Sequence, residues 1–285
     1  RAREPARLRR GRHTVVALIS YLHAPAGASL RRVAGLPLIL RNVLCLQKAK
    51  ETDLFVAVRP EDRAAVEALL TDERVRTSVH LVSGPAELDA RLALWGDPSV
   101  ALVLGDRVWL PRAWETLRAR AGSATAMVDA ASGAPTGMFL LAPAQAADLA
   151  AAGSPATWAG QRVPCPSDGT VAPVANDSDV PTAETLLVRA LIKPADGVVA
   201  RNINRKISTA ISKRIARFPI RPNHVTLVVL LIGVAAGPFA ATGTYVGFLL
   251  GGLCYYVSSI LDGVDGELSR LKYYASPLGA WLDTI

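Results

Sequence analysis

Three carboxylates near the end of the chain have a spacing that suits metal-dependent chemistry. Asp262 and Asp265 are three residues apart, so on a helix both side chains lie on one face. Asp283 follows further along. Carboxylates at the end of a long apolar segment are costly unless they bind a metal or line a wet cavity, and carboxylate oxygens suit Mg²⁺ or Mn²⁺. The sequence therefore predicts a site for one of these cations at Asp262, Asp265 and Asp283.

Small and basic residues accompany the carboxylates. Gly266 and Gly279 have no side chain, so a ligand or a neighbouring helix could approach the backbone closely. Arg270 could bind a phosphate through two parallel N–H···O bonds. These residues indicate that the metal site also receives a phosphate-containing ligand.

A long segment without charge precedes the carboxylates. Val225 to Leu261 contains no Asp, Glu, Lys or Arg over 37 residues. A membrane span needs about 20 apolar residues, so we expect two spans, at about 224–242 and 244–262, with a third beginning at about 277. Gly237-Pro238 and Gly243 are expected to supply the break between the first two. The alternative is one buried helical hairpin in a globular core, which seldom leaves so long a stretch uncharged.

The segment before the first span, 198–217, is amphipathic and basic. Its apolar residues recur every four positions and so line one helix face: Ile203, Ile207, Ile211 and Ile215. A solvated surface helix would show this pattern, and so would a helix that lies on a membrane surface. The spans that follow favour the membrane. Basic residues before a span mark the cytoplasmic side, so the active site and the N-terminal domain are expected in the cytoplasm.

The first part of the chain has the pattern of a separate α/β domain, at 14–192. Short β-branched runs predict strands at 15–19, 54–58, 79–82 and 101–104. Helical spacing is present at 38–50, 61–70, 113–120 and 182–192. Alternating strands and helices favour a Rossmann-like parallel sheet covered by helices. Gly, Pro and Ser predict loops at 152–174. A basic tail occupies 1–13, a linker 193–197, and an all-α transmembrane domain 198–285.

The overall composition excludes several classes of protein. The net charge of +8 is concentrated before residue 13 and around 201–221, and no nucleic-acid-binding motif accompanies it, so anionic lipid and phosphate are the expected partners. The three cysteines have neither metal-ligand spacing nor the density of a disulfide framework: Cys45, Cys165 and Cys254. The chain begins at Arg1 and stops at Ile285 within an apolar pattern, so we expect a fragment.

The carboxylate motif resembles that of the CDP-alcohol phosphatidyltransferases. Their pattern is Asp, two residues, Asp-Gly, two residues, Ala-Arg, eight residues, Gly, three residues, Asp, three residues, Asp. The chain matches it with every gap correct at six positions: Asp262, Asp265, Gly266, Arg270, Gly279 and Asp283. Ser269 stands where Ala is usual. The final Asp would fall two residues past Ile285, so we expect the printed chain to be catalytically inactive.

The resemblance implies roles for these residues and a reaction. Asp262, Asp265 and Asp283 would hold two Mg²⁺ or Mn²⁺ ions, with Asp283 beside the general base that the final Asp would supply. The expected CDP-binding residues are Asp262, Gly266, Ser269, Arg270, Gly279, Asn223 and Thr226. Pro-Asn before a helix is also an ordinary cap. The donor would be a CDP-alcohol, the acceptor an alcohol or polyol phosphate, and the product CMP. Membrane lipid is a further expected partner, and the resemblance allows a homodimer.

The domain at 14–192 resembles the sugar-nucleotide nucleotidyltransferases. Residues 27–38 resemble their nucleotide loop, and by the same resemblance Asp106 and Asp179 would be metal ligands. The segment 21–25, Tyr-Leu-His-Ala-Pro, departs from the glycine-rich loop that offers N–H groups to phosphates, and Leu36 stands where Lys is common. The domain is therefore interpreted as degenerate.

The fusion of the two domains resembles bifunctional inositol-phosphate cytidylyltransferase and di-inositol-phosphate-phosphate synthases. In that alternative the N-terminal domain makes the CDP-alcohol that the membrane domain consumes. Two further hypotheses are a cytidylyltransferase with a membrane anchor and a non-catalytic membrane scaffold. The sequence leaves open the acceptor, and whether the donor carries diacylglycerol or a polyol.

Overall fold

The structure is a computed structural model of the 285-residue chain. The residues it describes are 15–93, 99–120, 125–129, 132–142, 145–146, 149–150, 161–164, 169–192 and 204–274. The chain divides into two compact units, called here the sheet unit (1–31 and 37–183) and the helical unit (32–36 and 184–285). The predicted basic tail, the linker at 193–197 and the start of a third span lie outside the described residues.

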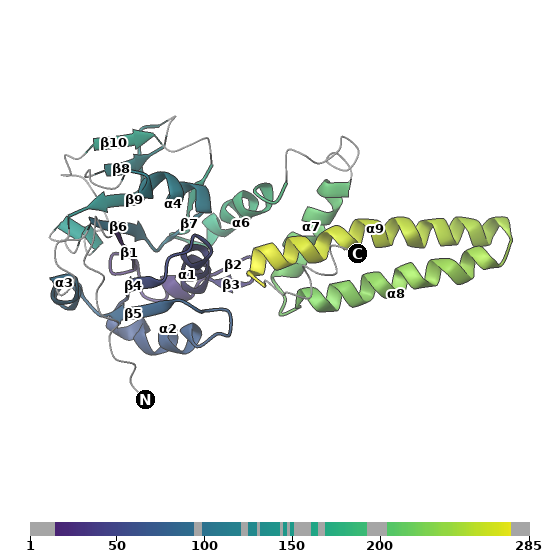
Figure 1. Ribbon diagram of the computed structural model, residues 1–285, viewed down its shortest axis with the longest axis horizontal. Helices are drawn as coiled ribbons and strands as arrows, with labels where there is room; N and C mark the ends of the chain where they lie inside the picture. Colours follow the sequence, from purple (N-terminus) through teal and green to yellow (C-terminus); the bar gives the residue numbers. More distant parts are fainter. Residues whose placement is uncertain are drawn as a thin grey trace. The chain divides into compact units, whose positions relative to one another are not determined.

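The sheet unit is built on a seven-stranded sheet of order β10-β8-β9-β6-β1-β4-β5 (Figure 1). The strands are β1 (Val15–Ser20), β4 (Asp53–Ala57), β5 (Ser78–Val82), β6 (Ser99–Leu104), β8 (Thr125–Val128), β9 (Pro135–Leu141) and β10 (Gln161–Pro164). The predicted parallel pairing is confirmed for β5-β4-β1-β6. β9 runs antiparallel to both β6 and β8, so the sheet is mixed rather than wholly parallel.

Helices and short strands complete the sheet unit. The helices are α1 (Leu38–Lys48), α2 (Arg63–Leu70), α3 (Pro85–Ala93) and α4 (Pro111–Arg118), and α6 (Val180–Arg189) crosses into the helical unit. A two-stranded ladder joins β7 (Arg107–Trp109) to β11 (Val171–Pro173), and a second ladder, of β2 (Arg32–Val33) and β3 (Leu36–Pro37), lies mostly in the helical unit. Three 3₁₀ turns are η1 (Ala28–Leu30), η2 (Pro60–Asp62) and η3 (Asp177–Asp179). The prediction of loops throughout 152–174 is wrong at β10 and β11. These strands have only four and three residues, and they form by pairing with neighbouring strands.

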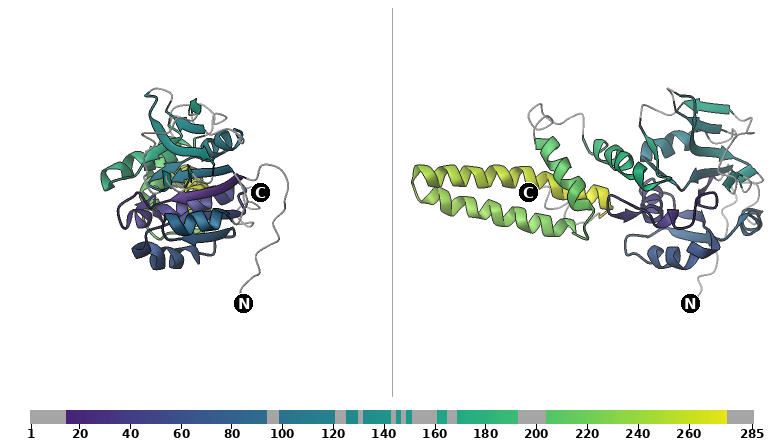
Figure 2. Two further views of the ribbon diagram at one scale, coloured as in Figure 1. Left: turned by 90° about the vertical axis from the view of Figure 1, so that its left-hand side faces the viewer. Right: turned by 180° about the vertical axis from the view of Figure 1, so that it is seen from behind.

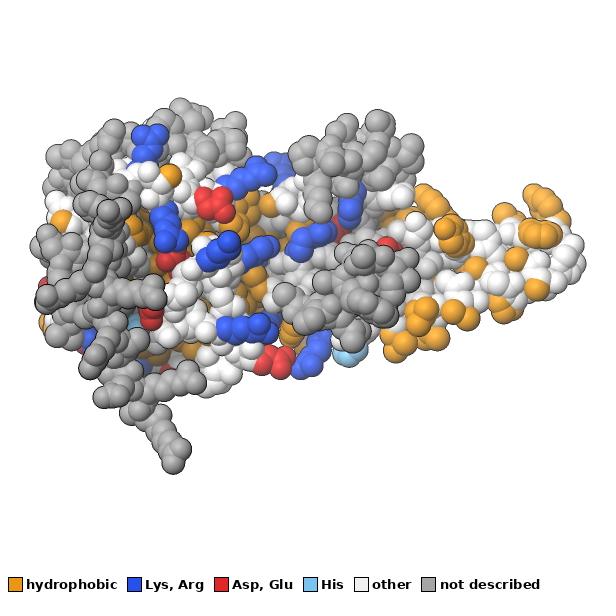
Figure 3. Space-filling model, viewed as in Figure 1, with side chains coloured by type: hydrophobic (Ala, Val, Ile, Leu, Met, Phe, Trp, Pro, Cys, Tyr) orange, Lys and Arg blue, Asp and Glu red, His pale blue; other side chains and the backbone are white. Residues whose placement is uncertain are grey.

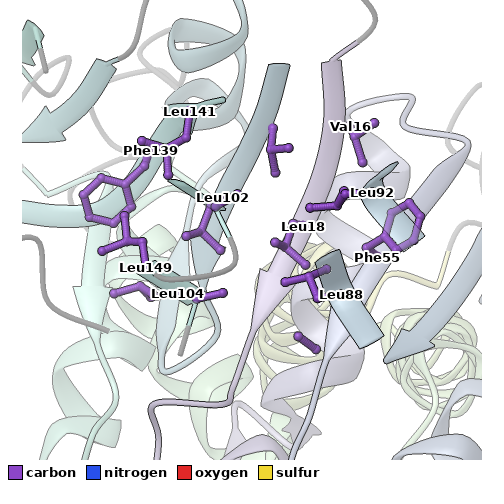
Figure 4. Packing of buried hydrophobic residues seen from close by; sticks show 14 of the residues in the cluster. Val16, Leu18, Phe55, Leu88, Leu92, Leu102, Leu104, Phe139, Leu141 and Leu149 are labelled. Atoms are coloured by element: carbon purple, nitrogen blue, oxygen red, sulfur yellow. The ribbon is translucent and has the colours of Figure 1, made fainter. Parts of the chain in front are cut away.

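One face of the sheet carries the main apolar cluster. Leu18, Phe55, Leu102 and Phe139 come from four strands and are 0–2% exposed, and α3 and Leu149 pack against this cluster (Figure 4). Successive side chains of a strand point to opposite faces. Both faces of the central strands are therefore covered, since the residues between these positions are also fully buried. This burial explains the near-continuous apolar runs from which the strands were predicted.

Among the described residues, the helical unit contains the helices α7 (Arg205–Ala216), α8 (Pro222–Ala241) and α9 (Tyr245–Lys272), together with the part of α6 from Glu184 onward. α8 and α9 form an antiparallel hairpin that both views show side by side (Figures 1 and 2). Gly243, with φ +67°, makes the turn between them, and the Thr244 side chain accepts a hydrogen bond from the Gly247 N–H at 3.1 Å. Gly237-Pro238 lies inside α8, so the prediction of a break there is wrong. The second predicted span ends at 262, whereas α9 continues to Lys272.

Apolar side chains cover the outside of this hairpin. α8 and the apolar part of α9 have mean hydropathies of 2.0 and 1.3, and only 6% and 17% of these segments are buried. Figure 3 shows the hydrophobic side chains exposed along both helices. Leu231, Val234 and Phe248 are more than 60% exposed. A core helix of a soluble protein would bury such residues, and both helices are long enough to cross a membrane.

Candidate active site

The described part of the carboxylate motif, Asp262 to Arg270, lies in the C-terminal turns of α9. Asp262 is exposed, while Asp265, Gly266 and Ser269 are half-buried. The helix ends at Lys272 and is followed by Tyr273 in the left-handed conformation, with φ +56°. Because the helix is unbroken through the motif, the two carboxylates share one face as their spacing predicted. Gly279 and Asp283, the other predicted members, lie outside the described residues.

The start of α8 contributes a side chain to the motif. Thr226 Oγ donates a hydrogen bond to Asp265 Oδ2 at 2.8 Å, from the first turns of a helix that begins at Pro222. This hydrogen bond fixes the orientation of one carboxylate. Asn223 is exposed three residues before Thr226 and therefore lies on the same side of α8. The structure thus brings Thr226 to the predicted site and places Asn223 at its edge.

Arg270 has a buried hydrogen-bond donor at the same end of α9. Its Nε is buried and, within the described part of the chain, has no hydrogen-bond partner. A Cβ atom added at Gly266 would lie 4.0 Å from Arg270 Nη2 and would meet no other atom within 4 Å, so space remains beside the guanidinium. A buried donor without a partner is unfavourable in the absence of a ligand. An anion such as phosphate would satisfy it.

The described residues fit a divalent cation only in part. Asp262 and Asp265 supply hard oxygen donors, and Arg270 suits an anion that would accompany the metal. Across the described residues, no group of three or more His, Cys, Asp or Glu side chains could hold a metal ion. The third predicted ligand, Asp283, is not among those residues. The metal site therefore remains a prediction.

Glu267, two residues after Asp265, is a buried acidic residue that its sequence pattern alone did not reveal. Its side chain is fully buried and accepts hydrogen bonds from Ser208 Oγ at 2.8 Å, Ser212 Oγ at 2.7 Å and Arg205 Nη1 at 3.2 Å. The three donors come from one stripe of α7. Their spacing, at i, i+3 and i+7, was a signal that could have been read from the sequence.

The two faces of α7 have opposite character. The buried face is small and polar, with Ser208, Thr209 and Ser212 among its residues, and it packs on α9. Ile207 is 41% exposed, and Ile211 and Ile215 are half-buried. Ile203 lies outside the described residues, and the position of this segment at a membrane surface stays a prediction.

In the sheet unit, the side chain of Asp106 is already paired. His23 Nε2 lies 3.1 Å and Arg107 Nε 3.4 Å from Asp106 Oδ1. Burial raises the pKa of Asp106, but the contact with His23 and the charge of Arg107 lower it by more, so the pKa lies below its usual value. A cation at Asp106 would have to compete with both neighbours.

Tyr21 occupies the space beside this carboxylate. A Cβ atom added at Gly105 would lie 2.4 Å from the Tyr21 ring, and Asn42 Nδ2 donates to the Tyr21 hydroxyl at 3.1 Å. Burial strongly raises the pKa of the Tyr21 hydroxyl, and the hydrogen bond from Asn42 offsets only part of that effect. The segment 21–25, which stands in place of a glycine-rich loop, thus puts the neutral Tyr21 ring against Gly105 at the end of β6.

The expected nucleotide loop is also held by the chain's own groups. The Asp62 carboxylate, missed in the sequence, accepts from the Gly27 N–H at 3.0 Å and from Ser29 Oγ at 3.3 Å. Arg31 Nε donates to Asp177 at 2.7 Å. Asp179, the second predicted ligand, accepts from the Asn176 N–H at 2.9 Å in a capping box. The groups that would contact a nucleotide triphosphate or its metal have partners within the unit.

The curated relatives of this chain are named as transferases, so the comparisons indicate a transferase. No family model matches the chain. The chain is 40% identical over 108 residues to the bifunctional IPC transferase and DIPP synthase of Thermococcus kodakarensis, and 43% identical over 108 residues to the protein of that name from Archaeoglobus fulgidus. Each match covers 38% of this chain, and 24% or 21% of the relative. The chain thus matches less than a quarter of the length of these relatives.

Two solved structures are similar to part of this chain. One is a putative glucose-1-phosphate thymidylyltransferase from Bacillus anthracis, 14% identical with a TM-score of 0.47, covering 61% of this chain and 95% of that one. Another is the 4-diphosphocytidyl-2C-methyl-D-erythritol synthase of Anaerococcus prevotii, 12% identical with a TM-score of 0.45, covering 61% and 98%.

Proposed function

We propose that the protein is a CDP-alcohol phosphatidyltransferase, which transfers a phosphoalcohol group from a CDP-alcohol to an acceptor hydroxyl and releases CMP. The observation that carries the proposal is the pair Asp262 and Asp265, on one face at the end of an apolar helical hairpin. The unpartnered Nε of Arg270 supports an anionic ligand beside them. The names of the relatives support a transferase.

The chemistry follows from the charges at this end of α9. The acceptor hydroxyl oxygen forms a bond to the phosphorus that carries the donor's alcohol. The bond from that phosphorus to the bridging oxygen breaks, CMP leaves with its electron pair, and the hydroxyl proton passes to a carboxylate base. Asp262, Asp265 and the predicted Asp283 would hold Mg²⁺ or Mn²⁺, which neutralises charge on the diphosphate when bound. Arg270 would bind a phosphate oxygen, and Thr226 orients Asp265.

The setting of this reaction is proposed to be the cytoplasmic face of a membrane. The exposed apolar side chains of α8 and α9 support two spans, and the basic residues of α7 and its flanks support a cytoplasmic position for the motif. Because both hairpin ends return to one side, the start of α8 and the end of α9 share it. The donor, the acceptor alcohol or polyol phosphate, and membrane lipid are the partners that this setting brings together.

A second candidate is a bifunctional enzyme whose sheet unit makes the CDP-alcohol. The word bifunctional in the relatives' names favours it. The paired state of Asp106 and the Asp62 carboxylate at the Gly27 N–H argue against nucleotide chemistry in the sheet unit. We therefore place the activity in the helical unit.

Asp265→Asn in the full-length protein tests the proposal. CMP release from CDP-alcohols, measured in detergent with Mg²⁺, should fall at least about 100-fold, because the amide loses the negative charge that holds the metal. EDTA should abolish release by the unaltered protein. Asp53→Asn makes the same chemical change at an exposed residue of the sheet unit and should leave release unchanged. Undiminished release by Asp265→Asn would remove the metal site from the proposal.

A further inference from the structure

Lys272, the last residue of α9, is a buried basic residue that the proposed reaction does not use. Only 4% of it is exposed. Its ammonium group donates hydrogen bonds to the carbonyl oxygens of Phe218 at 2.6 Å and of Ile220 at 2.9 Å, both in the segment that joins α7 to α8. Burying an ammonium group is costly unless hydrogen bonds replace its water. An apolar side chain would fill the space without that cost, so the lysine is best explained by the backbone that it holds.

The two carbonyls lie in register with the hydrogen bond between Thr226 and Asp265. Lys272 follows Asp265 by seven residues, nearly two full turns, so both side chains lie on one side of α9. α8 runs antiparallel to α9, and seven residues before Thr226 is Pro219, which stands between the two carbonyl acceptors of Lys272. Lys272 therefore continues the pairing of the two helices past the first residue of α8.

The start of α8 lies at the open end of the hairpin, opposite the turn at Gly243. Its N-cap residue, Arg221, makes no side-chain capping hydrogen bond. A hydrogen bond from Ser258 Oγ to the Val229 carbonyl at 3.1 Å fixes the middle of the hairpin, and Lys272 fixes its open end. The apolar contacts along the rest of the two helices have no preferred direction.

The site requires that this end be held closely. A displacement of the first turn of α8 by about 1.5 Å, the rise of one helical residue, would break the 2.8 Å hydrogen bond from Thr226 to Asp265. Two further hydrogen bonds from α9 to the backbone directly before α8 oppose such a displacement. The orientation of Asp265 thus depends on a residue two turns away.

We propose that Lys272 is a positioning residue of the active site. By holding the Phe218 and Ile220 carbonyls, it fixes the first turn of α8 against the end of α9 and keeps the Thr226 hydroxyl on Asp265. This inference rests on the proposed function, because it explains how the same carboxylate is presented to its cation. Lys272 acts through Thr226 and not by contact with the substrate.

A double-mutant cycle in the full-length protein tests whether Lys272 acts through Thr226. Lys272→Met keeps an unbranched side chain and removes its donors. It should raise the Mg²⁺ concentration for half-maximal CMP release about tenfold, the effect of losing a group that orients a metal ligand. Thr226→Val should raise it by a similar factor, and the variant with both substitutions should be no worse than Thr226→Val alone. Two effects that multiply would show that Lys272 does not act through Thr226 and would overturn the inference.

Three other variants separate positioning from general stability. Lys272→Arg keeps the positive charge and the N–H donors, so it should recover most of the Mg²⁺ affinity. Lys206→Met makes the same change at an exposed residue of α7 and should leave the Mg²⁺ dependence unaltered. A lower melting temperature of Lys272→Met with an unaltered Mg²⁺ dependence would show a merely structural tie and overturn the inference. If Lys272→Met does not fold, Lys272→Gln, which keeps N–H donors on a shorter side chain, takes its place in the cycle.

Binding of Mn²⁺, followed by the EPR signal of the free ion, separates this inference from the proposed function. The same cycle read in Mn²⁺ dissociation constants needs no turnover, and Asp265→Asn gives the baseline for binding elsewhere on the protein. Binding weakened by Lys272→Met, and no further weakened in the double variant than in Thr226→Val, supports the inference even if no CDP-alcohol is turned over. That outcome would overturn the proposed function alone. An unaltered protein that neither binds Mn²⁺ nor releases CMP would overturn both.

Discussion

At the residue scale, the Thr226 hydroxyl determines how Asp265 is presented. Thr226→Val keeps the shape of the side chain and removes the hydrogen bond to Asp265 Oδ2, at 2.8 Å. Groups that orient metal ligands typically contribute about 10- to 100-fold to metal affinity or activity. We therefore expect the Mg²⁺ concentration for half-maximal CMP release to rise about tenfold. A titration of CMP release against Mg²⁺ measures this rise.

Thr226→Ser is the matched control, because it keeps the hydroxyl and removes a methyl group. Its Mg²⁺ dependence should stay close to that of the unaltered protein. Equal Mg²⁺ curves for the valine and serine variants would mean that Asp265 is held by other groups, or that it does not bind the metal.

Residue spacing could predict that Asp262 and Asp265 share a face because both lie on α9. The i, i+3 relation of Asp262 and Asp265 needs only a helix to place both on one face. Asp62 and Glu267 were missed for the opposite reason. Each is an ordinary acidic residue in the sequence and acquires its role from a distant partner, Gly27 or Ser212. The pairing of Asp106 with His23 likewise depends on how β1 and β6 align.

At the element scale, two adjacent glycines of α9 have different surroundings. A Cβ atom added at Gly251 would lie 2.9 Å from the Ala236 carbonyl oxygen of α8 and 3.3 Å from the Ala240 nitrogen, whereas one added at Gly252 meets nothing within 4 Å. Gly251→Ala must push two backbones apart, at a cost of about 1–3 kcal/mol. Gly252→Ala should be neutral or stabilising, since Ala favours helix by up to about 1 kcal/mol.

Thermal unfolding in detergent checks this pair of variants. The melting temperature of Gly251→Ala should be lower than that of the unaltered protein, while that of Gly252→Ala should not be. If both variants unfold at one temperature, the close packing of α8 on α9 does not exist in solution. The two substitutions are the same in chemistry and one residue apart in sequence, so general effects of alanine cancel.

The elements that the sequence predicted well are those with a strong period or an uninterrupted apolar run. β1, β4 and β6 were expected because both of their faces are buried, and the half-buried edge strand β5 was expected from its short apolar run. β10 and β11 were not, since strands of three or four residues carry little pattern of their own. Pro238 was expected to interrupt a helix because it removes a backbone hydrogen bond and crowds the carbonyl one turn earlier, but α8 continues past it to Ala241.

At the scale of the whole molecule, the two units are expected to differ in activity. The full-length protein should release no pyrophosphate from CTP and polyol phosphates with Mg²⁺ above the blank. The carboxylate of Asp106, the predicted metal ligand, is paired with His23 and Arg107. The N–H of Gly27, in the predicted nucleotide loop, already donates a hydrogen bond to Asp62. Pyrophosphate release reports only cytidylyl transfer, whereas CMP release reports the proposed reaction of the helical unit.

Turnover of CTP to pyrophosphate would favour the bifunctional candidate over the present proposal for the sheet unit. It would require that a nucleotide displaces Asp62 and that a cation displaces His23 on binding. The Asp265→Asn variant should behave like the unaltered protein in this assay, since its change lies in the other unit. The comparison therefore assigns any activity found to one unit.

In the proposed membrane setting, the unequal lengths of α8 and α9 would determine the depth at which the proposed reaction takes place. At about 1.5 Å per residue, the 20 residues of α8 span about 30 Å, close to the thickness of the hydrocarbon core. The 28 residues of α9 span about 42 Å, so its last turns project about 12 Å further. At the same rise per residue, Asp262 lies about 27 Å from the start of α9, at the edge of the hydrocarbon core, and Arg270 lies about 39 Å from it, at the level of the lipid headgroups. An acyl-chain-bearing substrate could react there without leaving its leaflet. Hydrophobic mismatch in a thicker bilayer would draw these groups toward the acyl chains, so bilayer thickness itself becomes a determinant of the rate.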